Sequence, residues 1–484
     1  MTSRELLALL VVAVPALAAA LVATVPRRHV HVAATIGAIA SSAAAAALSI
    51  VALSSPGSPL VEPWVVVDAA AGLLVGVIGI VGLTAVLVSP AYLATTTTGL
   101  VRPERRPRTF YALIFGFWAI LAAVPLVGNL GGAWLLVEAS TAASALLVGF
   151  GGKPRALEAA WKYLILTSLG LSVALLGIVM LAAGSAHGGL DALSWRELAH
   201  VHSKDALIAY LLLLAGLASK VGWAPVHNWL PDAHSEAPAP VSALLSAALL
   251  PAVLLVAWRS SQALTPVIGA SAAQSVLVGF GLLSLAVAVP FLWQPMAWKR
   301  LLAYSSLEHM GVIALGVGFG TPLALAGVAV HVVGHALAKA LGFYAATPLL
   351  GHEPRAGGHA VRGIGRTQGP LGSVLGISLG ALAGLPPSPL FVSEVFIVAG
   401  GFAAGRPWTA AAAAALLALG FLGLAHALID TVAGKAPARD RTAPGLRGVV
   451  LLTSVAVPCL LGLTAVALWL PSSAIARALV RGIQ

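Results

Sequence analysis

Ionisable side chains stand inside several strongly apolar segments of this chain. A charged side chain at the centre of a bilayer costs about 2.5–3.5 kcal/mol even on insertion scales, so such residues are candidates for function. Carboxylate, imidazole and ammonium groups can take up and release protons, and together they predict a proton relay. The candidates are Glu138, Lys220, Glu308, His309, His331, His335, Lys339 and Glu394.

Three of these residues recur at a helical spacing. His331, His335 and Lys339 are four residues apart, which places them along one stripe of one helix. This histidine–lysine stripe predicts a wire for protons. The alternative is that its members are polar contacts between helices, with Lys339 reaching the rim of the membrane. A zinc site is not favoured, because two histidines need a third ligand and a protonated lysine cannot supply one.

Glycine and proline residues interrupt two of the apolar segments, and each interruption lies next to a charged residue. Such a break frees backbone carbonyls, and discontinuous helices at corresponding positions of two halves point to a transport site. The separation of Glu138 from Lys220 is nearly the same as that of Glu308 from Glu394, which predicts a five-helix unit repeated in inverted orientation. The interrupting residues are Gly222, Pro225 and Pro231 after Lys220, and Pro386, Pro387 and Pro389 before Glu394.

The elements that must position these residues are membrane-spanning helices. Of the 484 residues, 59% are hydrophobic and only 9% are charged, which excludes a soluble fold. The mean hydropathy is +0.98. At about 20 residues per crossing, we predict an all-α polytopic membrane protein with about fourteen transmembrane helices and two broken helices. The predicted organisation is a three-helix segment at 1–109, inverted five-helix repeats at 110–258 and 259–433, and a C-terminal helix at 434–484.

Basic residues are distributed unevenly over the predicted loops, and the formal net charge is +11. Assigned to alternate faces, more than twice as many Lys and Arg fall on the face that includes the loops near 102–108, 355–366 and 435–447. The positive-inside rule places this face in the cytoplasm and both termini on the outer side. We therefore expect a multi-pass protein of the bacterial cytoplasmic membrane that binds no nucleic acid.

The single cysteine, Cys459, lies in an apolar run without a partner in the sequence. A disulfide, an iron–sulfur cluster or a cysteine-ligated metal within this chain is thereby excluded. The sequence also shows no cofactor motif and no nucleophile constellation. We therefore expect no cofactor, no metal ion and no catalytic site in this chain, so that any redox reaction belongs to another subunit.

Three motifs resemble a known family of membrane subunits. The segment GLASKVGWAPVHNWLPDAHSEAPAPVSALLS covers 216–246, KRLLAYSSLEHMG covers 299–311, and HALAKALGF contains His335 and Lys339. They resemble the antiporter-like subunits shared by respiratory complex I, Mrp-type cation/proton antiporters and group 4 membrane-bound hydrogenases. The Glu-His pair after AYSSL and the chain length are most similar to the F-type subunit of hydrogenase-4-like complexes.

The resemblance implies a fourteen-helix core with a chain of buried charges that conducts protons along the membrane plane. It implies that Glu138 is the acid paired with Lys220, that the histidine–lysine stripe is the central relay, and that Glu394 is the charged group of the second broken helix. His426 and Asp430, four residues apart, are a candidate proton exit, and alternatively a satisfied pair.

One departure from the family concerns the span after Lys220. Many relatives carry a His or Lys there, whereas this sequence runs SALLSAALLPAV, with Ser246 and Pro251 at the candidate positions. The step from Lys220 to the stripe must then use water or the hydroxyls of Ser242 and Ser246. We expect a water-lined gap at this place, with Pro251 leaving a carbonyl free to bind a water molecule.

These observations predict a proton-translocating subunit of a redox-driven multisubunit complex. Its expected partners are other membrane subunits, a peripheral redox arm and the lipid bilayer. Three alternatives remain: a sodium/proton antiporter module of the Mrp type, a membrane partner that energises CO2 or bicarbonate uptake by a soluble zinc subunit, and a non-conducting scaffold. Proton flux distinguishes the proton-translocating subunit and the sodium/proton antiporter from the scaffold. The sodium dependence of that flux distinguishes these two transporters from each other.

Overall fold

The computed structural model describes residues 2–95, 106–186, 188–189, 191–349, 362–435 and 446–481. Nearly all of the described chain is helical, with one antiparallel pair of two-residue strands, β1 (Leu60–Val61) and β2 (Val66–Val67). Parts of the basic loops that indicate the orientation, at 96–105, 350–361 and 436–445, lie outside the described residues.

The helices follow one another with short connections. The first group is α1 (Ser3–Thr24), α2 (Val30–Ser54), α3 (Ala69–Thr95), α4 (Arg106–Ala123), α5 (Leu130–Val148) and α6 (Pro154–Ala183). The central group is α7 (Ala206–Val221), α8 (Trp229–Glu236), α9 (Ala239–Leu244), a π-helical turn (Leu245–Leu249), α10 (Leu250–Ile268), α11 (Ala270–Leu292), α12 (Trp298–Phe319) and α13 (Pro322–Tyr344). The last group is α14 (Ala346–Leu349), α15 (Ile364–Thr367), α16 (Gly369–Leu382), α17 (Pro389–Ala403), α18 (Pro407–Ala433), α19 (Leu446–Trp469) and α20 (Ala474–Arg481). Short 3₁₀ turns lie at Arg27–His29, Val124–Leu126, Gly149–Gly151, Asp191–Leu193, Glu197–His200 and Leu470–Ser472.

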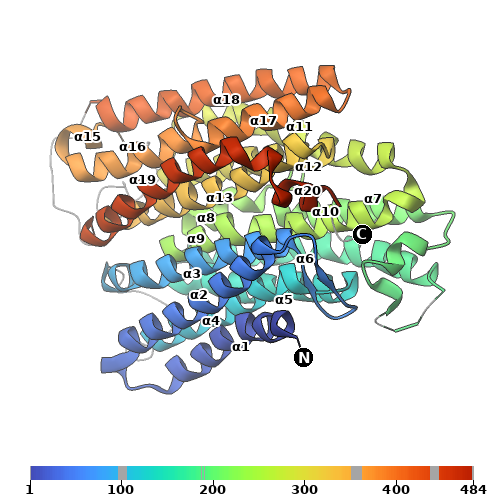
Figure 1. Ribbon diagram of the computed structural model, residues 1–484. Coiled ribbons are helices and arrows are strands. Elements are labelled where there is room, and N and C mark those ends of the chain that lie inside the picture. The colour runs from blue at the N-terminus through green and yellow to red at the C-terminus, as the bar shows by residue number, and fades with distance from the viewer. Residues whose placement is uncertain are drawn as a thin grey trace.

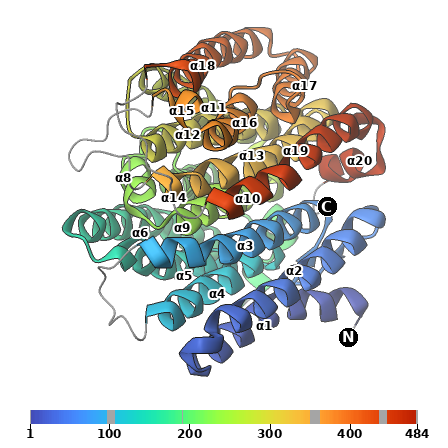
Figure 2. The same cartoon turned by 90° about the vertical axis from the view of Figure 1, so that its left-hand side faces the viewer.

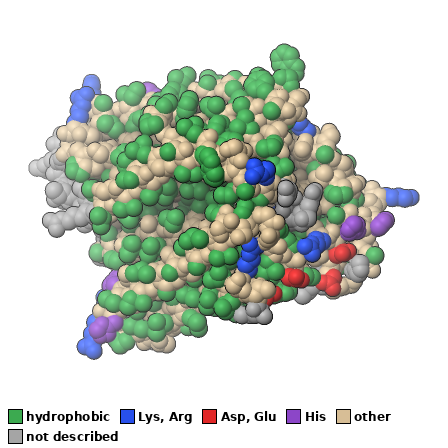
Figure 3. All heavy atoms as spheres, viewed as in Figure 1, with side chains coloured by type: hydrophobic (Ala, Val, Ile, Leu, Met, Phe, Trp, Pro, Cys, Tyr) green, Lys and Arg blue, Asp and Glu red, His purple; other side chains and the backbone are tan. Residues whose placement is uncertain are grey.

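The predicted all-α polytopic membrane class is confirmed. Twelve helical stretches among the described residues are long and apolar enough to cross a membrane, and three shorter apolar helices accompany them, Ala206–Val221, Gly369–Leu382 and Pro389–Ala403. On the face drawn in Figure 3, hydrophobic side chains cover the broad middle, and charged side chains gather toward the ends of the helices. If α7 and the α16–α17 pair each belong to an interrupted span, the total reaches fourteen; that count stays a prediction.

Both predicted interruptions are present. Helix α7 ends at Val221, and Gly222 follows in the left-handed conformation with φ of 80°. Helix α16 ends at Leu382, and Gly384 has φ of 70°. Each glycine is followed three residues later by a proline in a cis peptide bond, at Ala224–Pro225 and Pro386–Pro387. The two interruptions are thus built alike, while the inverted repeats and their boundaries stay predictions.

The helices that carry most of the candidate residues lie at the centre of the bundle. In Figures 1 and 2, α1, α2 and α4 lie on one side and α18 on the opposite side, with α8, α10, α12 and α13 between them. The most apolar windows of the α9–α10 span and of α12 are completely buried. Figure 1 also shows both chain ends at the same end of the bundle. Charges on the central helices are therefore enclosed by protein.

Candidate functional site

The first group of polar residues surrounds Lys220, which is fully buried at the end of α7. Its Nζ donates to the hydroxyl of Tyr163 on α6 and lies 4.5 Å from the centre of that ring. The Tyr163 hydroxyl is also 2.7 Å from the hydroxyl of Ser144 on α5. Glu138 accepts a hydrogen bond from Ser168 at 2.6 Å, and its other carboxylate oxygen is buried without a partner among the described residues. No ion pair within 4.0 Å joins these two described residues, Glu138 and Lys220, so Tyr163 is the direct partner of the lysine.

Close packing of α6 on α7 puts Tyr163 within reach of Lys220. Tyr163, Gly170 and Gly177 recur every seven residues on one face of α6. A Cβ at Gly170 would collide with Ser219, and a Cβ at Gly177 would collide with the Ala209 carbonyl, both on α7. The glycines therefore allow the two backbones to approach, as small residues do in membrane bundles.

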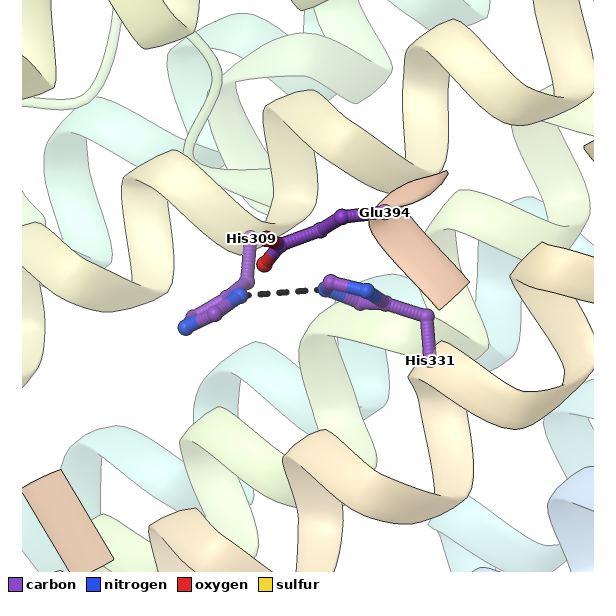
Figure 4. A group of neighbouring side chains, drawn as sticks. All are labelled: His309, His331 and Glu394. Carbon is purple, nitrogen blue, oxygen red and sulfur yellow. Dashed lines mark hydrogen bonds between the residues drawn. The ribbon is translucent and has the colours of Figure 1, made fainter. Parts of the chain in front are cut away.

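The second group is a cluster of three imidazoles from two helices. His309 comes from α12, and His331 and His335 come from α13; all are buried. The ring centre of His309 lies 5.1 Å from that of His331 and 5.2 Å from that of His335, so His309 is close to both. Figure 4 shows His309 and His331 meeting edge to edge, with Glu394 reaching toward them from α17. The cluster thus joins three helices that are separate in the sequence.

The hydrogen bonds indicate a proton position for two of these rings, those of His309 and His331. Ser393 has one hydroxyl proton, which it donates to the Leu390 carbonyl at 2.7 Å, so it must accept from Nδ1–H of His331 at 2.8 Å. A neutral His331 then accepts at Nε2 from Nδ1–H of His309, at 3.0 Å. Nε2 of His309 is buried and makes no hydrogen bond among the described residues, and the backbone of Leu382 interacts with this imidazole. It can receive an incoming proton.

Glycines on α13 explain how α17 comes so close. Gly327 and Gly334 flank His331 on the same face. A Cβ at Gly327 would lie 2.8 Å from the Ser393 carbonyl oxygen, and one at Gly334 would lie 3.2 Å from Pro389. The two glycines therefore let His331 reach Ser393.

Lys339 and Glu308 lie beside the imidazoles. Lys339 is fully buried, donates from Nζ to the Leu302 carbonyl at 2.6 Å, and interacts electrostatically with Glu308. Glu308 leans against α18, where a Cβ at Gly420 would collide with its carboxylate. Glu394 stands at the second interruption, with Oε2 2.9 Å from the place a Cβ of Gly384 would occupy. Both carboxylates are thus packed against glycine backbone.

The two groups are separated by the span that contains Ser242 and Ser246. Both serines are fully buried; Ser242 donates to the His234 carbonyl at 2.9 Å, and Ser246 shares a 2.7 Å hydrogen bond with Ser306 on α12. The span widens into its π-helical turn just before Pro251, which has no N–H for the helix ladder. Both hydroxyls thus already have protein partners, and the predicted water-lined gap stays a prediction.

His234 on α8 is a further buried imidazole near the histidine–lysine stripe. It is fully buried, stacks on Phe343 at 5.2 Å, and has no hydrogen-bond partner for either ring nitrogen among the described residues. It lies within electrostatic range of Lys339 and His335. His234 and Tyr163 were both missed from the sequence. His234 stands between acidic residues like a solvated histidine, and only its place in the 216–246 motif could have singled it out.

His426 and Asp430 lie apart from both groups, near the end of α18. Their side chains are 63% and 31% exposed and 4.0 Å apart, and Asp430 also pairs with Arg362 at 3.3 Å. They line a surface pocket with Trp293, Met296 and Trp298. Their role as an exit stays a prediction.

A buried ion pair holds the bundle at another place. Arg259 on α10 donates to Asp68 at 2.8 Å and to the Pro125 carbonyl at 2.7 Å. Asp68 also accepts from the backbone N–H of Ala71 at 2.7 Å, so it caps the start of α3. The pair ties α10 to α3 and lies outside both groups.

Comparisons with known proteins agree with the resemblance predicted from the motifs. The family described as "NADH:quinone oxidoreductase/Mrp antiporter, TM" matches residues 127–420. The chain is 34% identical over 354 residues to the "Hydrogenase-4 component F homolog" of Methylacidiphilum infernorum, covering 71% of this chain and 74% of that protein. It is 31% identical to "NADH-quinone oxidoreductase subunit N" of Desulforudis audaxviator, covering 71% and 68%.

Solved structures share the fold. A chain of the archaeal membrane-bound sulfane sulfur reductase superposes with a TM-score of 0.84 at 20% identity, covering 99% of this chain and 97% of that one. A chain of the Mrp complex from Dietzia sp. DQ12-45-1b gives 0.82 at 20% identity, with the same coverage. The arrangement of helices is therefore one used in several membrane complexes.

Proposed function

Because this chain belongs to the NADH:quinone oxidoreductase/Mrp antiporter membrane family, we propose that it is the proton-translocating subunit of a redox-driven membrane complex. One observation supports this most directly. Lys220, His309, His331, His335 and Lys339 are all buried in the middle of a hydrophobic bundle. Such groups are costly in a membrane and belong to ion pathways when they occur there.

The proposed route crosses the bundle from α5 to α17. It starts at Glu138, passes Tyr163 and Lys220, crosses to His234 by way of bound water, and continues through Lys339 and the three imidazoles to Glu394. Figures 1 and 2 place α5 and α17 on opposite sides of the bundle. Both terminal acids belong to partly exposed residues, and we propose that each faces a neighbouring subunit. Glu308 and the pair His426–Asp430 form a candidate side exit along α18.

The chemistry of the second group favours protons over sodium. A sodium ion needs a cage of oxygen ligands, as hard cations do, whereas this group is built on imidazole nitrogens. Imidazole nitrogens can accept and release protons, which suits them to a proton relay. The sodium/proton antiporter is therefore the second candidate, and the CO2-uptake partner and the scaffold are further alternatives.

The proposed setting follows that of the relatives. Their printed names place them in hydrogenase, quinone oxidoreductase and Mrp complexes. We propose that this chain likewise works with other membrane subunits and a peripheral redox arm, in the bacterial cytoplasmic membrane with both termini outside. No cofactor or catalytic site is assigned to this chain. The reading frames adjacent to its gene test the identity of the complex.

Reconstituted vesicles test the function. The complex containing this chain is placed in lipid vesicles, its redox reaction is started, and internal pH is followed with a fluorescent dye, with and without sodium. Proton flux independent of sodium, and lost in Lys220→Ala, is expected. Flux that requires sodium indicates the antiporter, and unchanged flux in Lys220→Ala indicates the scaffold.

A further inference from the structure

His309, His331 and Glu394 bring three ligand atoms together in a way the sequence did not indicate. One ligand atom from each residue lies within 4.8 Å of the other two, and Nδ1 of His309 is 3.0 Å from Nε2 of His331. Zinc at its usual 2.0–2.1 Å from each ligand spaces tetrahedral ligands about 3.3–3.4 Å apart. The two nitrogens need to separate only slightly, and the carboxylate needs to close in. The sequence pattern argued against zinc because a third ligand was missing. Glu394 on α17 supplies that ligand.

We propose that these three residues form a binding site for a divalent late transition-metal ion, with Zn²⁺ as the probe, and that the bound ion blocks the relay. Two nitrogens and one carboxylate suit zinc, copper or nickel, and they exclude Na⁺, Mg²⁺ and Ca²⁺, which take oxygen ligands. Three protein ligands leave a fourth position for water. Only the blocking effect rests on the function proposed above.

The hydrogen bonds around His331 already suit a ligand. Its Nδ1–H is held by Ser393, so Nε2 presents its lone pair toward His309. Metal-bound histidines are commonly oriented by a hydrogen bond from the other ring nitrogen. His309 binds the ion after its proton moves from Nδ1 to Nε2, which keeps the ring neutral. The ion then occupies the position of the proton shared by the two rings, which is why it blocks transfer between them.

Glu394 balances part of the added charge and provides access. Its carboxylate is the only half-buried ligand of the three, and it lies at the helix interruption beside Gly384. Glu308 lies within electrostatic range of both Glu394 and Lys339, so its carboxylate offsets the nearby charge of the lysine. A dication is therefore not left uncompensated in the membrane interior.

Metal binding tests the site without any measurement of transport. The full-length chain in lipid nanodiscs is dialysed against Zn²⁺, and retained zinc is counted; Co²⁺ in its place reports geometry through its visible absorption. We expect one ion per chain that is lost in His331→Ala and in Glu394→Gln and kept in the controls His335→Asn and His426→Asn. Equal zinc retention by wild type and His331→Ala, or a six-coordinate Co²⁺ spectrum, overturns the proposal.

The Ser393→Ala variant tests whether metal binding at this site inhibits the proton relay, because it leaves all three ligands in place. Loss of such an orienting partner weakens metal binding by about 10- to 100-fold. We expect the zinc concentration that halves proton flux in vesicles to rise by a similar factor relative to wild type. Zinc bound at this site without any effect on measured flux overturns the blocking claim alone. A preparation with no flux but with the expected zinc and cobalt results contradicts the proposed function and leaves the metal site standing.

Discussion

The two polar groups share a backbone design and differ in chemistry. Each includes a helix interruption with a left-handed glycine followed three residues later by a proline. Around the first interruption the lysine donates to the hydroxyl of Tyr163, which in turn shares a hydrogen bond with the hydroxyl of Ser144. Around the second, carboxylate and lysine meet three imidazoles. A hydroxyl passes a proton only while another is taken up, whereas an imidazole has a free nitrogen that can bind an extra proton. The first group is therefore suited to gating and the second to storing protons.

The packing behind the two groups also differs. In the first, glycines on α6 let the neighbouring α7 approach, so the contacts join helices adjacent in the sequence. In the second, Gly327 and Gly334 on α13 admit α17, and His309 enters from α12. Both groups use three helices, but the second includes α17, which is not adjacent in the sequence to α12 or α13.

The largest effect is expected at Lys220, because it is the one basic residue that contacts Tyr163 in the described part of the chain. Lys220→Ala is expected to reduce proton flux in reconstituted vesicles to background. Lys220→Arg should not restore it, because a guanidinium does not release its proton in the working range.

The matched control for this change is Lys162, a lysine on α6 that is 38% exposed and pairs with Glu158 on the same helix. Lys162→Ala is expected to keep flux, since a surface pair contributes little. Wild-type flux in Lys220→Arg contradicts the gating role and leaves the lysine as a fixed charge.

The second effect is expected at His234, through which the proposed route connects the two groups. His234→Phe keeps an aromatic ring against Phe343 and removes both nitrogens, so flux is expected to fall to a small fraction of wild type. The control is His227→Phe, because His227 is half-buried and precedes α8 in the same 216–246 motif. If both variants conduct equally, the two groups are joined by another route.

Much of the fold could be predicted from the sequence, because hydropathy and the glycine–proline breaks are local signals. The same is true of the stripe, since His331, His335 and Lys339 belong to one helix. Contacts between helices could not be predicted. Spacing places a residue on a face of its helix but does not say which helix it meets, so neither the Lys220–Tyr163 contact nor the approach of His309 to His331 followed from the motifs.

A moderate effect is expected at Tyr163, where Tyr163→Phe removes the hydroxyl between Lys220 and Ser144. A hydrogen bond to a charged group contributes about 1.5–3 kcal/mol, which corresponds to roughly 10- to 100-fold in rate if it is needed during transfer. Flux in vesicles measures this. Tyr210→Phe is the matched control, because Tyr210 is equally buried on α7 and its hydroxyl donates to the Ala273 carbonyl instead. Equal flux in the two variants removes Tyr163 from the gate.

The smallest effect is expected at Ser246, which tests whether the groups are joined by serine hydroxyls or by His234. Ser246→Ala removes one neutral hydrogen bond, and Ser306 keeps its bond to the Leu302 carbonyl at 2.9 Å. The net cost of such a bond is about 0.5–1.5 kcal/mol, so flux should change by roughly tenfold at most. Ser246→Leu adds volume at a fully buried position and costs about 1–3 kcal/mol of stability through overpacking, which thermal unfolding of the variant measures. If a Ser246→Ala variant folds normally but loses all flux, protons cross between the two groups at Ser246 and Ser306 and not at His234. The water-lined gap expected from the sequence then explains the connection better.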